Sequence, residues 1–361
     1  MKRGSARLKR AASLVAYWRD RRLVLANYQT NSLVNADPII VAVLDFFDDW
    51  RSPAEFYSHL PTYTRESLDR ALLQLLDATF LVRKGSQEAR DDAKLEHVWS
   101  GWLPAAGLLH FCSKNLAYIT DLAQARRFLR ERAKRVAIPP AVKYYPSAPQ
   151  LPLPASAGDG EFPSVLLRRR TWRRFSPRPV ELSSLATLLR LSWGVQHWIK
   201  LPGMGRVALK TSPSAGARHP IEVYVLAVRV AGLPRGLYHY RSDANRLELL
   251  KAGASSRQLA KYVADQSWYG SAAALMIMTA VFPRTHWKYQ DPCAYRTVLL
   301  DAGHACQTFC LVATWLGLAP FCTMALSESE IERDLRIDGI EESVLYAAGV
   351  GTCPADGDWA S

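Results

Sequence analysis

A short segment from Arg168 to Phe175, RRRTWRRF, concentrates five arginines around one threonine. The guanidinium group of arginine stays charged and forms paired hydrogen bonds with the oxygens of a phosphate. The segment therefore predicts a site for a phosphorylated ligand. The alternative interpretation is a solvated basic surface that Trp172 and Phe175 cap.

A second segment, TSPSAGARHP from Thr211 to Pro220, is a loop of small residues. Glycine and alanine let a flat ring lie against bare backbone, where N–H groups reach it. Together the two segments predict a planar, phosphorylated cofactor, and flavin mononucleotide (FMN) fits best. For this loop the alternative is an ordinary Pro-Ser-Gly turn.

These motifs resemble those of a known family. RRTWRRF resembles the RRSxRxF opening of the nitroreductase superfamily. PSAGARHP resembles the PSAGxxxP loop of its SagB-type branch, the thiazole/oxazole-forming dehydrogenases. Two further segments agree with it, namely WKY followed by AYRTVLLDAGHACQTFCLVATWLGL, and ESVLYAAGVG near the end of the chain. The four motifs occur in the family's order, and the resemblance covers roughly residues 160 to 352.

The resemblance implies which residues contact FMN. The phosphate, the ribityl chain and the N1–O2 side of the ring would be held by Arg169, Arg170, Thr171 and Arg173. The ring edge would meet a loop from the second subunit of a homodimer, formed by Pro213, Ser214, Ala215 and Gly216. Backbone at Thr323, Met324 and Ala325 would pass over the flavin. Arg218 and His219 depart from the family, which usually has an apolar and an aromatic residue there.

The resemblance also implies a catalytic pair, Lys288 and Tyr289. Aromatising a thiazoline or oxazoline removes a proton from Cα and a hydride from Cβ, with the hydride going to flavin N5. A lysine that is partly neutral takes the proton, and a tyrosine shares it or orients the ring. The alternative is a surface cation over an aromatic ring.

Further polar residues lie on or before a long apolar segment. Arg296, Asp301, His304 and Gln307 match the family's YRxxLLxAGHxxQ signature, and for His304 we expect packing and hydrogen bonding in preference to acid–base chemistry. No CxxC pair occurs among the six cysteines. Cys306 and Cys310 lie four apart on a helical pattern and are expected to be core thiols, so no metal site is predicted.

Composition sets the broad class. A chain of 361 residues with 49% apolar residues is long enough for two domains with their own cores. The net charge of +13 favours either an arginine-rich background with a cofactor phosphate, or an acidic partner. No apolar run reaches the length of a membrane span, and no signal peptide is recognised. We therefore expect a cytoplasmic protein with neither membrane nor nucleic acid as its partner.

Periodicity and composition predict three parts. Residues 1–135 resemble a winged-helix domain, mostly helical with a strand pair, including a helix that starts at Ser52-Pro53 and another after Thr64. Residues 136–160 form a proline-rich connector. Residues 161–361 form an α+β, nitroreductase-like FMN domain with a central, mostly antiparallel sheet flanked by helices.

The function predicted is an FMN-dependent azoline dehydrogenase acting on a ribosomal or carrier-bound peptide, with O2 reoxidising the flavin. A cyclodehydratase is the predicted partner, and the basic N-terminal module would engage it or the peptide. The second hypothesis is a nitroreductase-family enzyme that uses NAD(P)H on a small molecule or another modified residue. The third is a DNA- or peptide-binding adaptor without redox activity.

Overall fold

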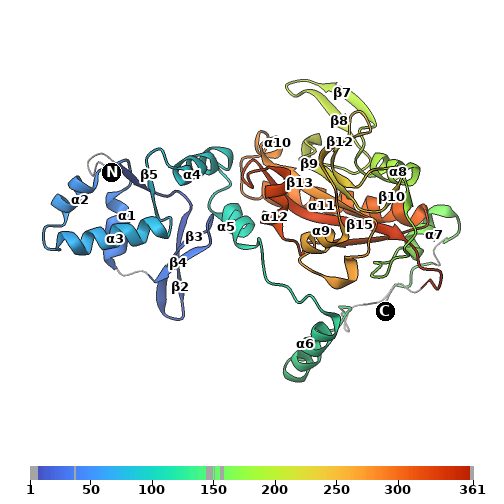
Figure 1. Ribbon diagram of the computed structural model, residues 1–361, viewed down its shortest axis with the longest axis horizontal. Coiled ribbons are helices and arrows are strands. Elements are labelled where there is room, and N and C mark those ends of the chain that lie inside the picture. Colours follow the sequence, from blue (N-terminus) through green and yellow to red (C-terminus); the bar gives the residue numbers. More distant parts are fainter. Residues whose placement is uncertain (1–6, 36–37, 144–148, 150, 155–157, 358–361) are drawn as a thin grey trace. The chain divides into compact units, whose positions relative to one another are not determined.

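The computed structural model describes residues 7–35, 38–143, 149, 151–154 and 158–357. Two compact units make up the chain (Figure 1). The N-terminal unit contains Met1–Lys114 together with two later segments, Val281–Leu299 and Asp338–Glu342. The remaining residues form the C-terminal unit. Part of the proline-rich connector, as well as the first six residues of the basic tail, lies outside the described residues.

Three helices form the first part of the N-terminal unit, and the last two of them start where the sequence predicts. They are α1 (Pro38–Phe46), α2 (Pro53–His59) and α3 (Arg65–Asp77). Ser52 caps α2 in a reciprocal capping box with Glu55, and Thr64 caps α3. These side chains satisfy backbone N–H groups that a helix start leaves without partners. Phe56 and the buried leucines of α3, which are Leu68, Leu72 and Leu75, then pack into one apolar cluster.

The strands of this unit are more numerous than the expected single pair. An antiparallel sheet of three strands precedes the helices, in the order β2 (Leu14–Arg19), β3 (Arg22–Asn27) and β4 (Ser32–Asn35). This sheet was not predicted, because the alternation of apolar and polar residues at Leu14–Trp18 is short. Its last residue, Trp18, is also exposed, unlike a typical core residue. Separately, β1 (Leu8–Arg10) pairs with β5 (Leu81–Arg83). The winged-helix assignment stays a prediction.

Helices from both the first and the later segments of the N-terminal unit surround an aromatic core. The helices here are α4 (Gln87–Val98), α5 (Ala105–Cys112), α10 (Phe282–His286) and the first turns of α11 (Ala294–Trp315). Trp99 is fully buried and packs edge-on against both Trp102 and Phe282. Its indole N–H donates to the Ile340 carbonyl at 2.9 Å. Residues far apart in sequence therefore share this core.

A six-stranded sheet is the centre of the C-terminal unit (Figure 1). Its strand order is β12 (Arg246–Ala252), β11 (Gly236–Arg241), β9 (Ile221–Ala227), β13 (Ala274–Val281), β15 (Glu342–Thr352) and β14 (Leu318–Thr323). The pairs β12–β11, β11–β9, β9–β13 and β15–β14 are antiparallel. The predicted central, mostly antiparallel sheet is confirmed by these pairs.

Helices complete the C-terminal unit. The remaining ones are α6 (Leu122–Arg135), α7 (Glu161–Arg168), α8 (Leu182–Trp193), α9 (Ser256–Tyr262) and α12 (Glu328–Leu335). Two small pairs of strands join them: β6 (Val180–Glu181) with β10 (Val230–Ala231), and β7 (His197–Leu201) with β8 (Gly205–Leu209). Residues of α9, α12 and the sheet form one apolar cluster. An α+β unit with a mostly antiparallel sheet is therefore observed, as predicted.

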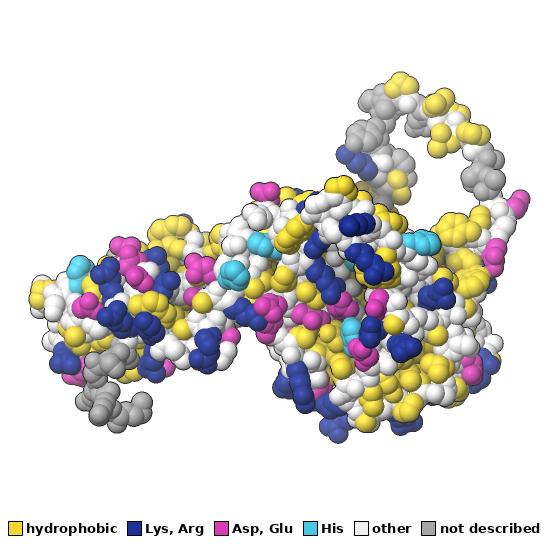
Figure 2. Space-filling model, turned by 90° about the horizontal axis from the view of Figure 1, so that it is seen from above, with side chains coloured by type: hydrophobic (Ala, Val, Ile, Leu, Met, Phe, Trp, Pro, Cys, Tyr) yellow, Lys and Arg dark blue, Asp and Glu magenta, His cyan; other side chains and the backbone are white. Residues whose placement is uncertain are grey.

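Positive charge is spread over the surface. On the face in Figure 2, lysine and arginine side chains are scattered over both units among acidic and apolar ones. No helix within the described residues is long and apolar enough to cross a membrane. The net charge of the chain thus does not correspond to one continuous basic patch on this face.

Candidate functional site

The arginine segment runs beside the edge strand of the C-terminal sheet. It leaves α7 at Arg168, and the backbone N–H of Trp172 donates to the Pro320 carbonyl of β14 at 2.9 Å. Arg169, Thr171 and Arg173 are half-buried. Main-chain hydrogen bonding to β14 thus fixes a segment that has no regular structure of its own.

Two half-buried guanidinium groups of this segment have no counter-ion in the part of the chain that the structure describes. Arg169 and Arg173 have no carboxylate within 4 Å among the described residues, whereas Arg174 pairs with Asp356 at 3.1 Å. A half-buried cation is stabilised by an anionic partner, and a phosphate suits the forked geometry of arginine. The donor chemistry of the segment therefore fits the phosphate of FMN. Arg170 is exposed and donates to the carbonyls of Leu167 and Arg169.

The end of β14 is held by a buried glutamine. Gln266 donates through its side-chain amide to Thr323 Oγ1 at 3.1 Å and to the Ala325 carbonyl at 3.0 Å. Thr323 is buried, while the side chain of Met324 is 68% exposed. Because the arginine segment is hydrogen-bonded to this same strand, both groups of predicted FMN contacts lie along β14. The sequence analysis did not identify the role of Gln266.

The small-residue loop has an unusual backbone. Gly216 has φ of +59°, and Ala217 and His219 have φ of +54° and +43°. L-residues other than glycine rarely adopt positive φ, so the loop stores strain. Such strain is tolerated only where surrounding contacts fix the chain, and it is concentrated at functional sites.

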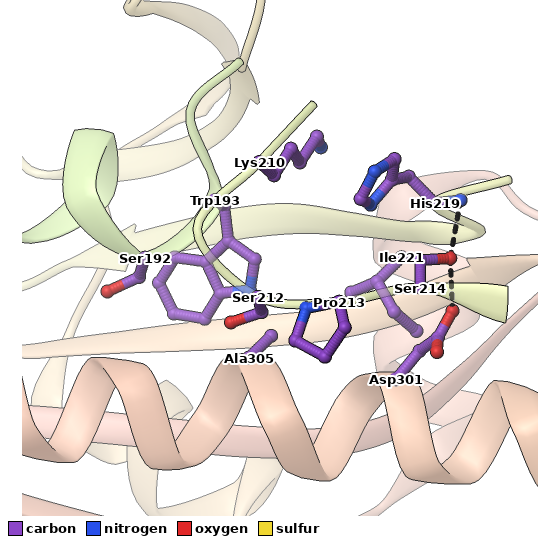
Figure 3. A pocket seen from close by; sticks show the side chains of 10 residues that line it. All are labelled: Ser192, Trp193, Lys210, Ser212, Pro213, Ser214, His219, Ile221, Asp301 and Ala305. Carbon is purple, nitrogen blue, oxygen red and sulfur yellow. Dashed lines mark hydrogen bonds between the residues drawn. The ribbon is translucent and has the colours of Figure 1, made fainter. Parts of the chain in front are cut away.

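Those contacts come from α11 (Figure 3). Ser214 donates its hydroxyl hydrogen to Asp301 Oδ2 at 2.6 Å and accepts from the backbone N–H of His219 at 2.8 Å. Asp301 is 7% exposed, and burial raises its pKa above the ordinary value while the hydrogen bond from Ser214 lowers it. The Ser214 side chain therefore fastens the loop to α11.

A small cavity of about 20 Å³ lies under the loop (Figure 3). It is lined by ten residues, which include Ser192, Trp193, Ser212 and Asp301. Two buried atoms at this cavity, Ser192 Oγ and Trp193 Nε1, have no hydrogen-bond partner among the residues that the structure describes. A volume of this size holds about one water molecule, and a buried polar atom without a partner is costly. The cavity therefore suits a single bridging water, not a substrate.

The predicted catalytic pair lies in the other unit. Lys288 and Tyr289 follow α10 and belong to the N-terminal unit, whereas all the predicted FMN contacts belong to the C-terminal unit. Lys288 is exposed, and its Nζ lies 5.3 Å from the centre of the Tyr289 ring. The Tyr289 carbonyl accepts a hydrogen bond from the Trp102 indole at 2.9 Å. The catalytic role of the pair stays a prediction.

The residues of the α11 signature have different environments. Arg296, His304 and Gln307 are exposed, while Asp301 is buried at the loop. Thr308, which stands where relatives frequently have asparagine, exchanges a 2.7 Å hydrogen bond with Ser212 of the loop. Two side chains of α11 thus hold the loop.

Comparisons with known proteins identify the family of this chain. The model of the nitroreductase family matches residues 166–352. The trifolitoxin-processing protein TfxB of Rhizobium leguminosarum bv. trifolii is 31% identical over 175 residues, which are 47% of this chain and 47% of TfxB. The chain thus matches only about half of TfxB. Protein MJ1384 of Methanocaldococcus jannaschii, which bears a nitroreductase name, is 31% identical over 173 residues, 48% of this chain and 83% of that protein.

Among solved structures, the Escherichia coli microcin synthetase McbBCD complex with truncated pro-MccB17 is similar at 18% identity and a TM-score of 0.47. The similar region covers 74% of this chain and 92% of that chain. The family model spans more than half of the sequence and includes the arginine segment, the small-residue loop and α11. The chain therefore belongs to the nitroreductase family of flavin-dependent oxidoreductases, as its motifs predicted.

Proposed function

We propose that this chain is an FMN-dependent dehydrogenase that oxidises thiazoline or oxazoline rings in a peptide to the aromatic azoles. The observation that carries the peptide substrate is the 31% identity to a protein named for processing trifolitoxin. That match covers less than half of each chain, so the substrate and the partners are part of the proposal. A cyclodehydratase would supply the azoline rings.

In this proposal each group of residues has a separate task. Arg169 and Arg173, which have no carboxylate partner among the described residues, bind the FMN phosphate and the electron-rich side of the ring. The Ser214–Asp301 hydrogen bond holds the strained loop so that its backbone N–H groups face the ring edge. Bound FMN would supply the acceptor for the hydride from Cβ of the azoline, with O2 as the final electron acceptor.

The Cα proton needs a base, and we assign it to Lys288 with Tyr289 orienting the heterocycle. One C–H bond breaks at each carbon: the electron pair of the Cα–H bond forms the new C=C bond, and the electron pair of the Cβ–H bond leaves with the hydride. Lys288 is exposed in the single chain, and a neutral lysine near pH 7 requires burial or a nearby cation. The bound peptide or the second subunit would supply that burial.

A homodimer completes the site in this proposal, with the loop of one subunit meeting the flavin of the other. An apolar groove on α7 and α11 supports it. The groove is lined by Glu161, Phe162, Val165, Leu191, Leu311, Val312 and Trp315. Phe162 is 64% and Trp315 is 46% exposed, which is costly for such large side chains in water.

The N-terminal unit would engage the peptide. Strand β4 is an edge of its three-stranded sheet, so it has unpaired backbone groups on one side. Beside it lies a groove of about 440 Å³ that β4, α1 and α3 line with residues such as Val34, Ile40 and Ala71. An extended peptide can add to such an edge and place apolar side chains in the groove.

The proposal is tested with purified protein, FMN and a synthetic peptide that contains one thiazoline. We expect a loss of two mass units (two hydrogens) from the peptide in the wild type, with NADPH leaving the flavin oxidised. Lys288→Ala should bind FMN normally but form azole at least about 100-fold more slowly, the contribution typical of a general base. Lys84→Ala, an exposed lysine of β5's turn, is the matched control. Full azole formation by Lys288→Ala would reject this base.

The second candidate is an NAD(P)H-dependent oxidoreductase of the same family. Arg218 and His219 favour it, since they place polar residues in the loop where relatives usually have apolar and aromatic ones. Rapid anaerobic bleaching of the flavin by NADPH would move the assignment to this candidate. The scattered positive charge in Figure 2 gives the DNA-binding alternative no support.

A further inference from the structure

Three cysteines that are separated in sequence converge inside the C-terminal unit. Cys306 and Cys310 lie on α11, and Cys322 lies on β14. Their three Sγ atoms all lie within 4.8 Å of one another. The sequence analysis expected core thiols at the first two positions and did not connect them with the third.

The secondary structure explains why the thiols meet. Residues four apart share one face of a helix, so Cys306 and Cys310 point the same way. Side chains alternate along a strand. Phe321 packs with the apolar cluster of α9 and α12, so its neighbour Cys322 points to the opposite face of β14, toward α11.

The set of donors indicates the class of ligand. All three donors are sulfur, and no histidine or carboxylate belongs to this group among the described residues. Soft thiolates select soft ions such as Cu(I) and Zn(II), but structural zinc sites almost always have four protein ligands. A site with three sulfurs suits an ion of lower coordination number.

We propose that Cys306, Cys310 and Cys322 bind one Cu(I) ion in a buried three-thiolate site. Cys306 and Cys310 are only 3% and 5% exposed, whereas Cys322 is partly exposed and gives the ion a path of entry. This proposal rests on the packing of α11 against β14 and needs no step of the proposed reaction, although Arg169 lies near both proposed sites.

The surroundings favour a negatively charged cluster. Three thiolates with one monovalent ion leave net negative charge, which needs compensation in a buried place. The Tyr346 hydroxyl of β15 donates a hydrogen bond to Cys322, and the guanidinium of Arg169 lies close enough to act on the same sulfur. Hydrogen bonds and charges of this kind orient metal ligands and strengthen binding.

The test uses the full chain, reconstituted with FMN and kept reduced under anaerobic conditions. Cu(I) is added in competition with a chromophoric Cu(I) chelator, and the bound copper is counted per chain. We expect one equivalent to resist the chelator and to give a thiolate-to-copper charge-transfer band. Cys310→Ser and Cys322→Ser should each weaken Cu(I) binding by about 100-fold or more, beyond what loss of an outer partner causes.

Cys293→Ser is the matched control, because that thiol is free and exposed in the N-terminal unit. It should keep the full Cu(I) affinity. Circular dichroism checks that each variant is folded, and Cys322→Ser keeps the test valid if a buried serine at position 310 prevents folding. The proposal is overturned if folded Cys322→Ser retains the copper, if Cys293→Ser loses it, or if Zn(II) binds in preference to Cu(I).

Discussion

At the scale of single residues, the site depends on a few polar groups whose partners come from distant parts of the chain. Ser214 bonds to Asp301, which lies 87 positions later. Arg169 and Arg173 are the opposite case, because they have no carboxylate partner among the described residues. The first arrangement fixes the loop, and the second leaves positive charge available to an anion.

The buried Asp301 predicts a pH dependence of stability. Burial raises its pKa in the folded chain above its ordinary value, so the folded state holds this proton at pH values where the unfolded chain has lost it. The free energy of unfolding should therefore fall as the pH rises from about 4 through the raised pKa. The difference in the free energy of unfolding between the wild type and Asp301→Asn should therefore shift against the wild type as the pH rises over this range. Urea unfolding of both proteins at several pH values measures this difference. A constant difference between the two proteins would contradict it.

The half-buried arginines predict a loss of cofactor affinity. Arg173→Ala removes a charged donor to FMN, a contribution of about 1.5–3 kcal/mol, so the Kd for FMN should rise by about 10–100-fold. Quenching of FMN fluorescence measures this. Arg178→Ala removes an exposed arginine nearby and should leave the Kd unchanged. Equal Kd values for Arg173→Ala and Arg178→Ala would exclude Arg173 from the FMN site.

At the scale of elements, the sequence signals that start helices acted locally. Ser52 and Glu55 form the capping box of α2. We expect Ser52→Ala to reduce the local stability of α2 by about 1 kcal/mol. Hydrogen exchange of the backbone amides of α2 after Pro53 should become about fivefold faster. Ser58→Ala, an exposed serine on the same helix, should change exchange little, and a similar change in both variants would show that the cap contributes nothing.

The contact between β14 and β15 predicts that glycine is required at position 349. Phe321 of β14 stacks on Tyr269 with ring centres 3.9 Å apart and lies directly over Gly349 of β15. A Cβ at position 349 would overlap the Phe321 ring. Gly349→Ala should therefore cost about 1–3 kcal/mol or more of unfolding free energy. At Gly270 a Cβ meets only ordinary contacts, so Gly270→Ala should be nearly neutral in the same thermal or urea unfolding.

At the scale of the whole molecule, the proposed dimer has flavin sites shared between its subunits. Loss of the dimer should therefore also weaken the binding of FMN. Val312→Arg places a charge in the apolar groove of α7 and α11, and burying an unpaired charge is costly. We expect this variant to elute as a monomer in size-exclusion chromatography with multi-angle light scattering, and to lose most of its FMN. Leu73→Arg, an exposed leucine of α3, is the control. A monomeric Val312→Arg that keeps its full FMN content would separate the flavin site from the dimer.

The sequence by itself determined the local features and the family. The helix starts at Ser52 and Thr64 and the apolar periodicity of α3 are signals between near neighbours, so no tertiary information was needed. The arginine segment and the small-residue loop indicated the family because binding a phosphate and a flat ring requires these particular residue types. The family model over residues 166–352 confirms that prediction.

Only the tertiary structure decided which distant side chains meet. The hydrogen bond of Ser214 to Asp301, the support of Thr323 by Gln266 and the grouping of Cys322 with two thiols of α11 all join separate elements. Such contacts depend on how the strands are ordered in the sheet and on which face of β14 packs against α11. Periodicity reports which face of an element is buried but not which partner buries it, and for that reason these contacts could not be predicted from the sequence.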